Sequence, residues 1–210
     1  MKITKTKSFK TFSEPLLTNN PVSVQILGIC SALAVTVQLK TSVVMALSLT
    51  FVVSFSSLII SAMRNLIPRN IRIIVELTVV ASLVIIADQL LKAFMYDVSK
   101  QLSVFVGLII TNCIVLGRAE TYAMSHPPHL SFLDGLGNGL GYGAILVLVG
   151  FMRELLGSGK LFGIGVVPDF AYNAGYENMG FMLLAPGAFI MIGLLAWLQN
   201  TVAPQKEQRK

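Results

Sequence analysis

The sequence alternates between long apolar runs and short polar or charged segments. Six apolar segments stand out, at residues 21–39, 41–63, 71–95, 101–117, 135–156 and 179–202. Because a helix needs about 17–25 mostly apolar residues to cross a membrane, the pattern predicts six transmembrane helices. The fourth segment has 17 residues between Lys100 and Arg118, which is the lower limit, and we expect this helix to be broken or half-spanning.

Composition supports this pattern. Of the 210 residues, 54% are hydrophobic and 12% are charged, and the mean hydropathy is +0.75. Soluble domains carry about 25% charged residues. We therefore predict an all-α integral membrane protein. It has a basic N-terminal tail at residues 1–20, a six-helix membrane domain at residues 21–202 and a C-terminal tail at residues 203–210.

The distribution of Lys and Arg predicts the orientation. If the N-terminus is cytoplasmic, the segments on the cytoplasmic side carry eleven basic residues and those on the other side carry five. Basic residues favour the cytoplasmic side, so both termini are predicted to be cytoplasmic. The N-terminal tail is expected either to lie on anionic lipid or to be a short disordered tail. No basic patch is interleaved with aromatic residues, so the net charge of +6 does not indicate nucleic-acid binding.

The two cysteines divide the chain into similar halves. Cys30 lies in the first apolar segment and Cys113 in the fourth, so each lies in the first of three spans, at about residues 21–98 and 99–202. These two spans are an odd number of spans apart and therefore cross the membrane in opposite directions. The arrangement predicts an inverted repeat with a functional site near the midplane, where the halves meet.

The two thiols have two interpretations. Cysteine is a small apolar residue that packs well between helices, and this interpretation needs no ligand. As thiolates, Cys30 and Cys113 could ligate a metal, but two thiolates are too few for the usual four-cysteine site. A metal site would therefore need a partner subunit to complete it.

Other polar residues within the spans are candidates for function. Thr111 and Asn112, directly before Cys113, could donate hydrogen bonds to the sulfur atoms of a cluster or bind neighbouring helices. Asp88 and Glu76 are intramembrane carboxylates, which are candidates for an ion path. Lys92 and Arg72 lie four residues from them, so interfacial ion pairs are the alternative.

Glycine occupies every second position from Gly135 to Gly143. No strand is expected before this stretch, so a dinucleotide-binding motif is excluded. On a helix, Gly135, Gly139 and Gly143 form a small-xxx-small face, which predicts close packing against another helix. The segment before it contains His126-Pro127-Pro128-His129, which we expect to form a loop.

Several stretches resemble a known family of membrane proteins. They are residues 27–36 around Cys30, residues 99–120 with Thr111-Asn112-Cys113, the glycine-rich residues 134–143, and residues 153–163. They resemble the family of D subunits of bacterial sodium-translocating NADH:quinone oxidoreductases. The related E subunit of the Rnf ferredoxin:NAD oxidoreductase shares the Thr-Asn-Cys core. The glycine-rich fifth span and residues 99–105 favour the quinone reductases.

The resemblance implies a site and a function. It implies a six-subunit complex in the bacterial inner membrane, with spans one and four of this chain broken. Cys30 and Cys113 would share an intramembrane [2Fe–2S] centre with a homologous E subunit of opposite topology. This centre would pass electrons from the NADH-, FAD- and ferredoxin-type subunit towards a covalently bound FMN and then ubiquinone, coupled to sodium export. Asp88 and Asp134 are similar to acidic positions implicated in the sodium path.

Two other functions stay open at this point. A self-contained secondary ion transporter would also have inverted halves with intramembrane acids, but it would be expected to carry more midplane charges than Asp88. An inert scaffold would have cysteines that only pack. An electron-relay subunit of this kind would carry no catalytic nucleophile or nucleotide site of its own.

Overall fold

The computed structural model describes residues 11, 12, 15, 20–94, 107–161, 164, 165 and 179–202. Helices form nearly all of these residues. In chain order the elements are α2 (Ile29–Val35), α3 (Leu39–Met63), η1 (Arg69–Ile71), α4 (Arg72–Phe94), α6 (Cys113–Arg118), η2 (Ala119–Ala123), α7 (Pro128–Ser158), β1 (Lys160–Leu161), β2 (Ile164–Gly165), η3 (Gly180–Leu183) and α9 (Ala185–Val202). The two strands form only a two-residue antiparallel pairing after α7. The predicted all-α membrane fold is confirmed.

Three of the predicted spans correspond to long continuous helices, and the sixth is divided at Leu184 into η3 and α9. The ranges Leu39–Met63, Arg72–Leu90 and Pro128–Ser158 are long and apolar enough to cross a membrane, and Ala185–Gln199 within α9 is a shorter apolar helix. The fifth span starts earlier than predicted, because Pro128 suits the first helical position. His129 therefore lies in the first turn of α7, and the prediction that it lies in a loop was wrong.

The first and fourth predicted spans are interrupted, as expected. Residues 21–24 form turns, residues 25–28 are not helical, and within residues 20–35 the chain is α-helical only in α2. Asn20 stands at the start of this stretch: its Oδ1 accepts from the Val22 amide at 3.0 Å and its Nδ2 donates to the Gly141 carbonyl at 3.0 Å. In the fourth span, residues 107–110 are helical, the helix breaks at residues 111–112, and α6 continues as the π-helical η2.

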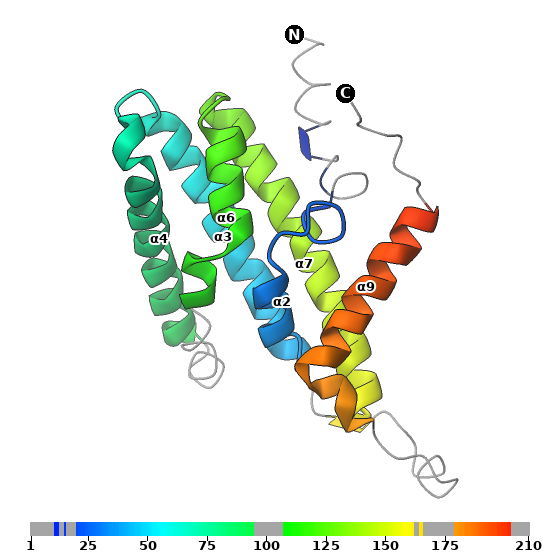
Figure 1. Cartoon of the computed structure of the whole chain (residues 1–210). Coiled ribbons are helices and arrows are strands. Elements are labelled where there is room, and N and C mark those ends of the chain that lie inside the picture. The colour runs from blue at the N-terminus through cyan, green and yellow to red at the C-terminus, as the bar shows by residue number, and fades with distance from the viewer. Residues whose placement is uncertain are drawn as a thin grey trace, which may run out of the picture.

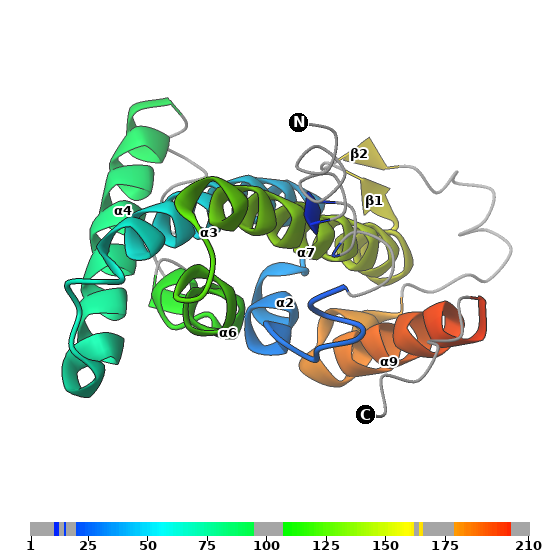
Figure 2. The same ribbon diagram turned by 90° about the horizontal axis from the view of Figure 1, so that it is seen from above.

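The helices of the first half (α2, α3 and α4) run in the opposite directions to those of the second half (α6, α7 and α9). In Figure 1, α2 and α4 run downward and α3 runs upward, whereas α6 and α9 run upward and α7 runs downward. The second half is thus antiparallel to the first, as an inverted repeat requires. Figure 2 shows α3 and α7 side by side through the centre, with the interrupted segments α2 and α6 next to each other.

The contact between α3 and α7 is close because α7 presents glycine to α3. A Cβ atom on Gly139 would lie 2.7 Å from Thr50 Cα, closer than real Cβ atoms approach. The small residues of α3 recur at the same spacing, so the helices approach along several turns. The predicted small-xxx-small packing is confirmed. The facing pairs are Gly135 with Ser54, Gly139 with Thr50 and Gly143 with Ala46.

Gly137 and Gly141, which lie between these positions, are on a second face of α7. A Cβ atom on Gly137 would lie 2.7 Å from the Phe12 carbonyl oxygen, and one on Gly141 would lie 2.7 Å from the Pro15 carbonyl oxygen. Residues two apart on a helix point in nearly opposite directions, since each residue advances about 100°. Glycine at every second position therefore lets α7 contact α3 on one side and the N-terminal segment on the other.

Replacing Gly139 with alanine tests this packing. Gly139→Ala should lower the free energy of unfolding by about 1–3 kcal/mol, because the added methyl group overpacks the α3–α7 contact. Gly193→Ala is the matched control, because Gly193 also lies in an apolar helix but nothing lies within 4 Å of its added Cβ. Titration of the purified protein from mild detergent into SDS measures both variants. Equal stability of the two would contradict the packing.

Candidate functional site

Cys30 lies at the start of the short helix α2, as its second residue. Gly28 precedes the helix as its N-cap, with a left-handed φ of 74°. A Cβ atom there would lie 2.7 Å from Ile114 Cδ1 and 3.0 Å from a ring carbon of Tyr142. Both the dihedral angle and the close approach therefore require glycine. The Cys30 thiol is free and exposed on this chain.

Cys113 lies at the start of the other short helix, α6, as its first residue. Asn112 is the N-cap, and its Oδ1 accepts from the Ile114 amide at 3.0 Å. The Thr111 hydroxyl donates to the Gly107 carbonyl at 3.0 Å, within the preceding helical turn. The Thr-Asn pair thus ends one helical segment and starts the next. The Cys113 thiol is also free and exposed on this chain.

A buried hydrogen-bond cluster of Ser31, Asn112 and Tyr142 joins the two interrupted segments to α7. The Asn112 side-chain amide donates to the Ser31 hydroxyl at 2.9 Å, and the Ser31 and Tyr142 hydroxyls lie 2.7 Å apart. Ser31 directly follows Cys30, and Asn112 directly precedes Cys113. The structure therefore brings the two predicted ligands into one neighbourhood, from opposite halves of the chain.

This cluster changes the interpretation of the residues before Cys113. Both the amide and the carbonyl of the Asn112 side chain have partners within the protein, and the Thr111 hydroxyl bonds to its own helical turn. The Asn112 contacts fit the alternative that this side chain connects segments of the fold, whereas the Thr111 bond stays within its own turn. Hydrogen bonds from Thr111 and Asn112 to the sulfur atoms of a cluster stay a prediction.

The two exposed thiols fit half of a four-thiolate site. The described part of the chain contains no group of three or more His, Cys, Asp or Glu residues that could hold a metal ion. A [2Fe–2S] centre with thiolate ligands takes four cysteines, and the whole chain has two. The donor set therefore matches such a centre only if another chain supplies the remaining ligands.

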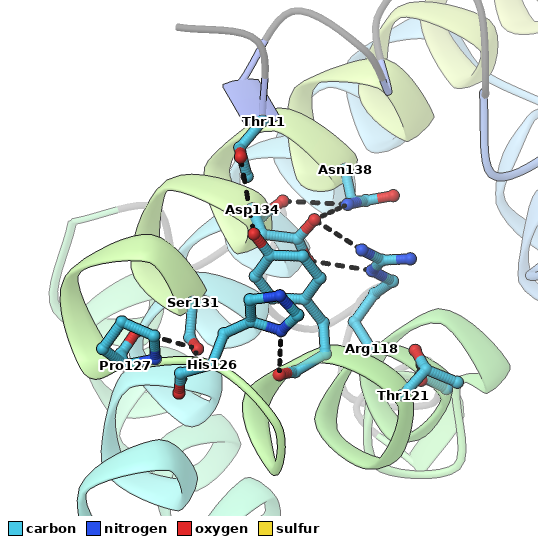
Figure 3. Close-up of polar contacts among 10 residues, drawn as sticks. Thr11, Arg118, Thr121, His126, Pro127, Ser131, Asp134 and Asn138 are labelled. Carbon is cyan, nitrogen blue, oxygen red and sulfur yellow. Dashed lines mark hydrogen bonds and ion pairs between the residues drawn. The ribbon is translucent and has the colours of Figure 1, made fainter. Parts of the chain in front are cut away.

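Asp134, one of the two acids that the resemblance links to the ion path, holds α6 to α7. Arg118 at the end of α6 donates to it through Nε at 2.9 Å and through Nη2 at 2.5 Å (Figure 3). Asn138, one turn further along α7, donates to the same carboxylate at 3.1 Å. The Arg118 guanidinium carbon also lies over the Tyr122 ring, 5.3 Å from its centroid, and Tyr122 stacks on His126. The Asp134 carboxylate is 3% exposed, so the ion pair is buried.

Asp88, the other predicted ion-path residue, lies near the end of α4. One of its carboxylate oxygens pairs with Lys92 at 2.5 Å, as the four-residue spacing suggests. Its other oxygen, Oδ1, is buried and has no hydrogen-bond partner. Glu76 does not follow the expected pairing, because Arg72 binds Glu120 instead at 2.5 Å. Glu76 is buried, and its Oε1 has no hydrogen-bond partner.

Sequence reasoning missed two residues that hold the site together. Tyr142 was hidden among the glycines of α7, where the pattern pointed to packing alone. Arg153 is one of the five basic residues assigned to the non-cytoplasmic side, yet it is 0% exposed and donates to Leu33 in α2 and to Thr36, the C-cap of α2. The predicted span 135–156 already contains Arg153, and this placement within an apolar helix was the available signal that its side chain is buried.

Comparison with known proteins identifies the family of this chain. Residues 8–196 match the model of the family described as "Rnf-Nqr subunit, membrane protein". The chain is 58% identical over 196 residues to proteins named as the D subunit of Na(+)-translocating NADH-quinone reductase from Shewanella sp. (strain ANA-3), Shewanella oneidensis and Shewanella baltica (strain OS155). In each comparison the match covers 93% of this chain and 93% of the relative. The chain belongs to the Rnf-Nqr family of membrane proteins.

Proposed function

We propose that this chain is the D-type membrane subunit of a sodium-translocating NADH:quinone reductase, and that Cys30 and Cys113 hold half of an intramembrane [2Fe–2S] centre. The relatives compared above carry this subunit name. The observation that carries the proposal is the 2.9 Å bond from Asn112 to Ser31, because it links the two cysteine-bearing segments while both thiols stay exposed.

The other half of the centre belongs to a partner subunit in this proposal. A polar or ionised group facing lipid is costly, so two exposed thiolates at membrane depth need a protein partner. The homologous E subunit of opposite topology, implied by the resemblance, would supply the other two cysteines. Exposure of both thiols on this chain supports a site that is completed across a subunit interface.

When bound, the centre supplies one-electron transfer between the complex's soluble and membrane redox groups. The residues of this chain hold its ligands in place. Gly28 and Asn112 set the start of each short helix, and the hydrogen-bond cluster fixes one helix against the other. Since Ser31, Asn112 and Tyr142 are each at most 3% exposed, these polar groups find partners without water.

Sodium export by the complex is part of the same proposal. The chain would lie in the bacterial inner membrane with both termini in the cytoplasm, as the Lys and Arg distribution predicts. Asp88 is the better candidate of the two acids for the ion path, because its buried Oδ1 has no hydrogen-bond partner. Asp134 is the weaker candidate, because Arg118 binds both of its oxygens.

Serine substitution of either cysteine tests the metal site. Cys30→Ser and Cys113→Ser should each remove one [2Fe–2S] centre from the purified complex, because serine is a poor substitute for a thiolate ligand. Electron transfer to the groups beyond that centre should stop. Iron content and the electron paramagnetic resonance spectrum of the reduced complex measure the loss.

Ala34→Ser is the control for these variants. Ala34 lies in α2, one turn after Cys30, and is half-buried, so the variant adds a hydroxyl to the same helix and keeps both thiols. It should retain iron and quinone reduction. A full complement of iron and normal quinone reduction in both cysteine variants would refute the proposed function.

Neutralising the two acids tests the ion path. Asp88→Asn should weaken the apparent sodium affinity of turnover by about tenfold, equivalent to ~1.4 kcal/mol, because a carboxylate charge is lost from the path. Asp134→Asn should instead reduce the amount of assembled complex, because it weakens the buried pair with Arg118. Turnover measured against sodium concentration separates the two effects. An unchanged sodium dependence in Asp88→Asn would leave Asp88 as a structural partner of Lys92.

A further inference from the structure

Arg153 has every one of its donors bound to oxygen in the interior of this chain. A guanidinium group carries five N–H donors. Arg153 Nε donates to the Met182 carbonyl at 3.0 Å, and Nη2 donates to the carbonyls of Leu183 and Leu184 at 2.8 and 3.3 Å. Nη1 donates to the Leu33 carbonyl at 3.2 Å and to the Thr36 hydroxyl at 2.5 Å. The side chain thus connects α7 to the end of α2 and to η3.

The contact at α2 satisfies groups that a helix end leaves without partners. The last carbonyls of a helix have no intrahelical donor, and Leu33 is one of the last residues of α2. The Thr36 hydroxyl donates to the Ala32 carbonyl at 2.6 Å while it accepts from Arg153. A helix of seven residues is not stable alone, so its position depends on such contacts.

Glu154, the next residue of α7, has a separate role. Its Oε2 accepts from the Leu39 amide at 2.5 Å, at the start of α3. No salt bridge between Arg153 and a carboxylate occurs in the part of the chain that the structure describes. Two neighbouring side chains of α7 therefore fix the two sides of the α2–α3 connection, Arg153 the end of α2 and Glu154 the start of α3.

Arg153 acts one turn away from the predicted ligand. Cys30 precedes Leu33 by three residues, so both lie on nearly the same face of α2. At the Cys30 end, Ser31 binds Tyr142 and Asn112. Without Arg153, α2 would keep that attachment and could pivot around it, which would move the thiol. Metal centres require their ligands within about 0.5 Å and 10–20° of the right geometry.

We propose that Arg153 is a positioning residue for Cys30: its bonds to Leu33 and Thr36 set the orientation of α2 and hence the geometry of the shared centre. The inference rests on the proposed function. It differs from a general contribution to stability, because it requires the centre itself to change when the guanidinium is replaced.

Arg153→Lys in the whole complex tests the proposal. Lysine keeps the positive charge but has one nitrogen, which cannot reach both α2 and η3 in the way the planar fork does. The spectral component that Cys30→Ser removes should change its line shape and reduction potential. Electron transfer through the centre should fall about tenfold or more, as for other residues that orient metal ligands. Potentiometric titration followed by electron paramagnetic resonance measures these changes.

Thr36→Val and Glu154→Gln complete the experiment. Thr36→Val removes only the hydroxyl that Arg153 binds. It should change the same spectral component in the same direction as Arg153→Lys, but by less. It also tests the proposal if the Arg153→Lys complex does not assemble. Glu154→Gln keeps a side-chain oxygen for the Leu39 amide and should leave the spectrum unchanged.

The outcomes separate this inference from the proposed function. Wild-type line shape and potential in the assembled Arg153→Lys and Thr36→Val complexes would overturn the role of Arg153, even if less complex were recovered. The wild-type complex provides the other comparison. If every spectral component of the wild-type complex were kept in Cys30→Ser and Cys113→Ser, the proposed function itself would fail.

Discussion

The site depends on how backbone groups find partners where two helices break inside a membrane protein. In hydrocarbon an unpaired N–H or C=O group costs several kcal/mol, so a break survives only when protein surrounds it. Here Asn112 accepts the amide of Ile114 after one break, and Arg153 binds the Leu33 carbonyl at the end of the other short helix. These side chains make the interrupted segments possible, and the segments in turn present the two cysteines.

Helix α7 supplies the frame on which both interrupted segments rest. Asp134 holds α6 through Arg118, Tyr142 meets Ser31 in the buried cluster, and Arg153 holds the end of α2. At about 1.5 Å per residue these three attachments lie ~12 and ~16 Å apart along the helix. The glycines of α7 lower its helix propensity, but they allow α3 and the N-terminal segment to lie directly against its backbone. Close packing and polar attachment are therefore combined in one helix.

Much of the fold follows from the sequence because hydrophobic runs and glycine spacing are local signals. The apolar run at residues 41–63 predicted α3 to within two residues at its start, and the spacing of Gly135, Gly139 and Gly143 predicted the close contact with α3. The structural effect of proline was predicted less accurately. Pro128 begins α7 inside the segment predicted as a loop, since proline favours the first helical turn as well as loops.

The cysteines could be selected as candidates from sequence, but the contacts around them could not. The bond between Ser31 and Asn112 joins residues 81 positions apart, and no local pattern records such a pairing. The same holds for Arg153, whose carbonyl partners carry no side-chain signature in the sequence. Long-range polar contacts of this kind become visible only when the helices are placed relative to one another.

The central claim is that Cys30 and Cys113 form half of a metal site that a second chain completes. The most direct measurement is the iron content of this chain purified alone, compared with the chain purified together with the homologous partner subunit. The account predicts no bound iron in the chain alone and about two iron atoms in the pair, with a [2Fe–2S] spectrum. A stable [2Fe–2S] spectrum from the chain alone would contradict it. So would the absence of iron from the purified pair when the complex that contains the same two subunits is fully active.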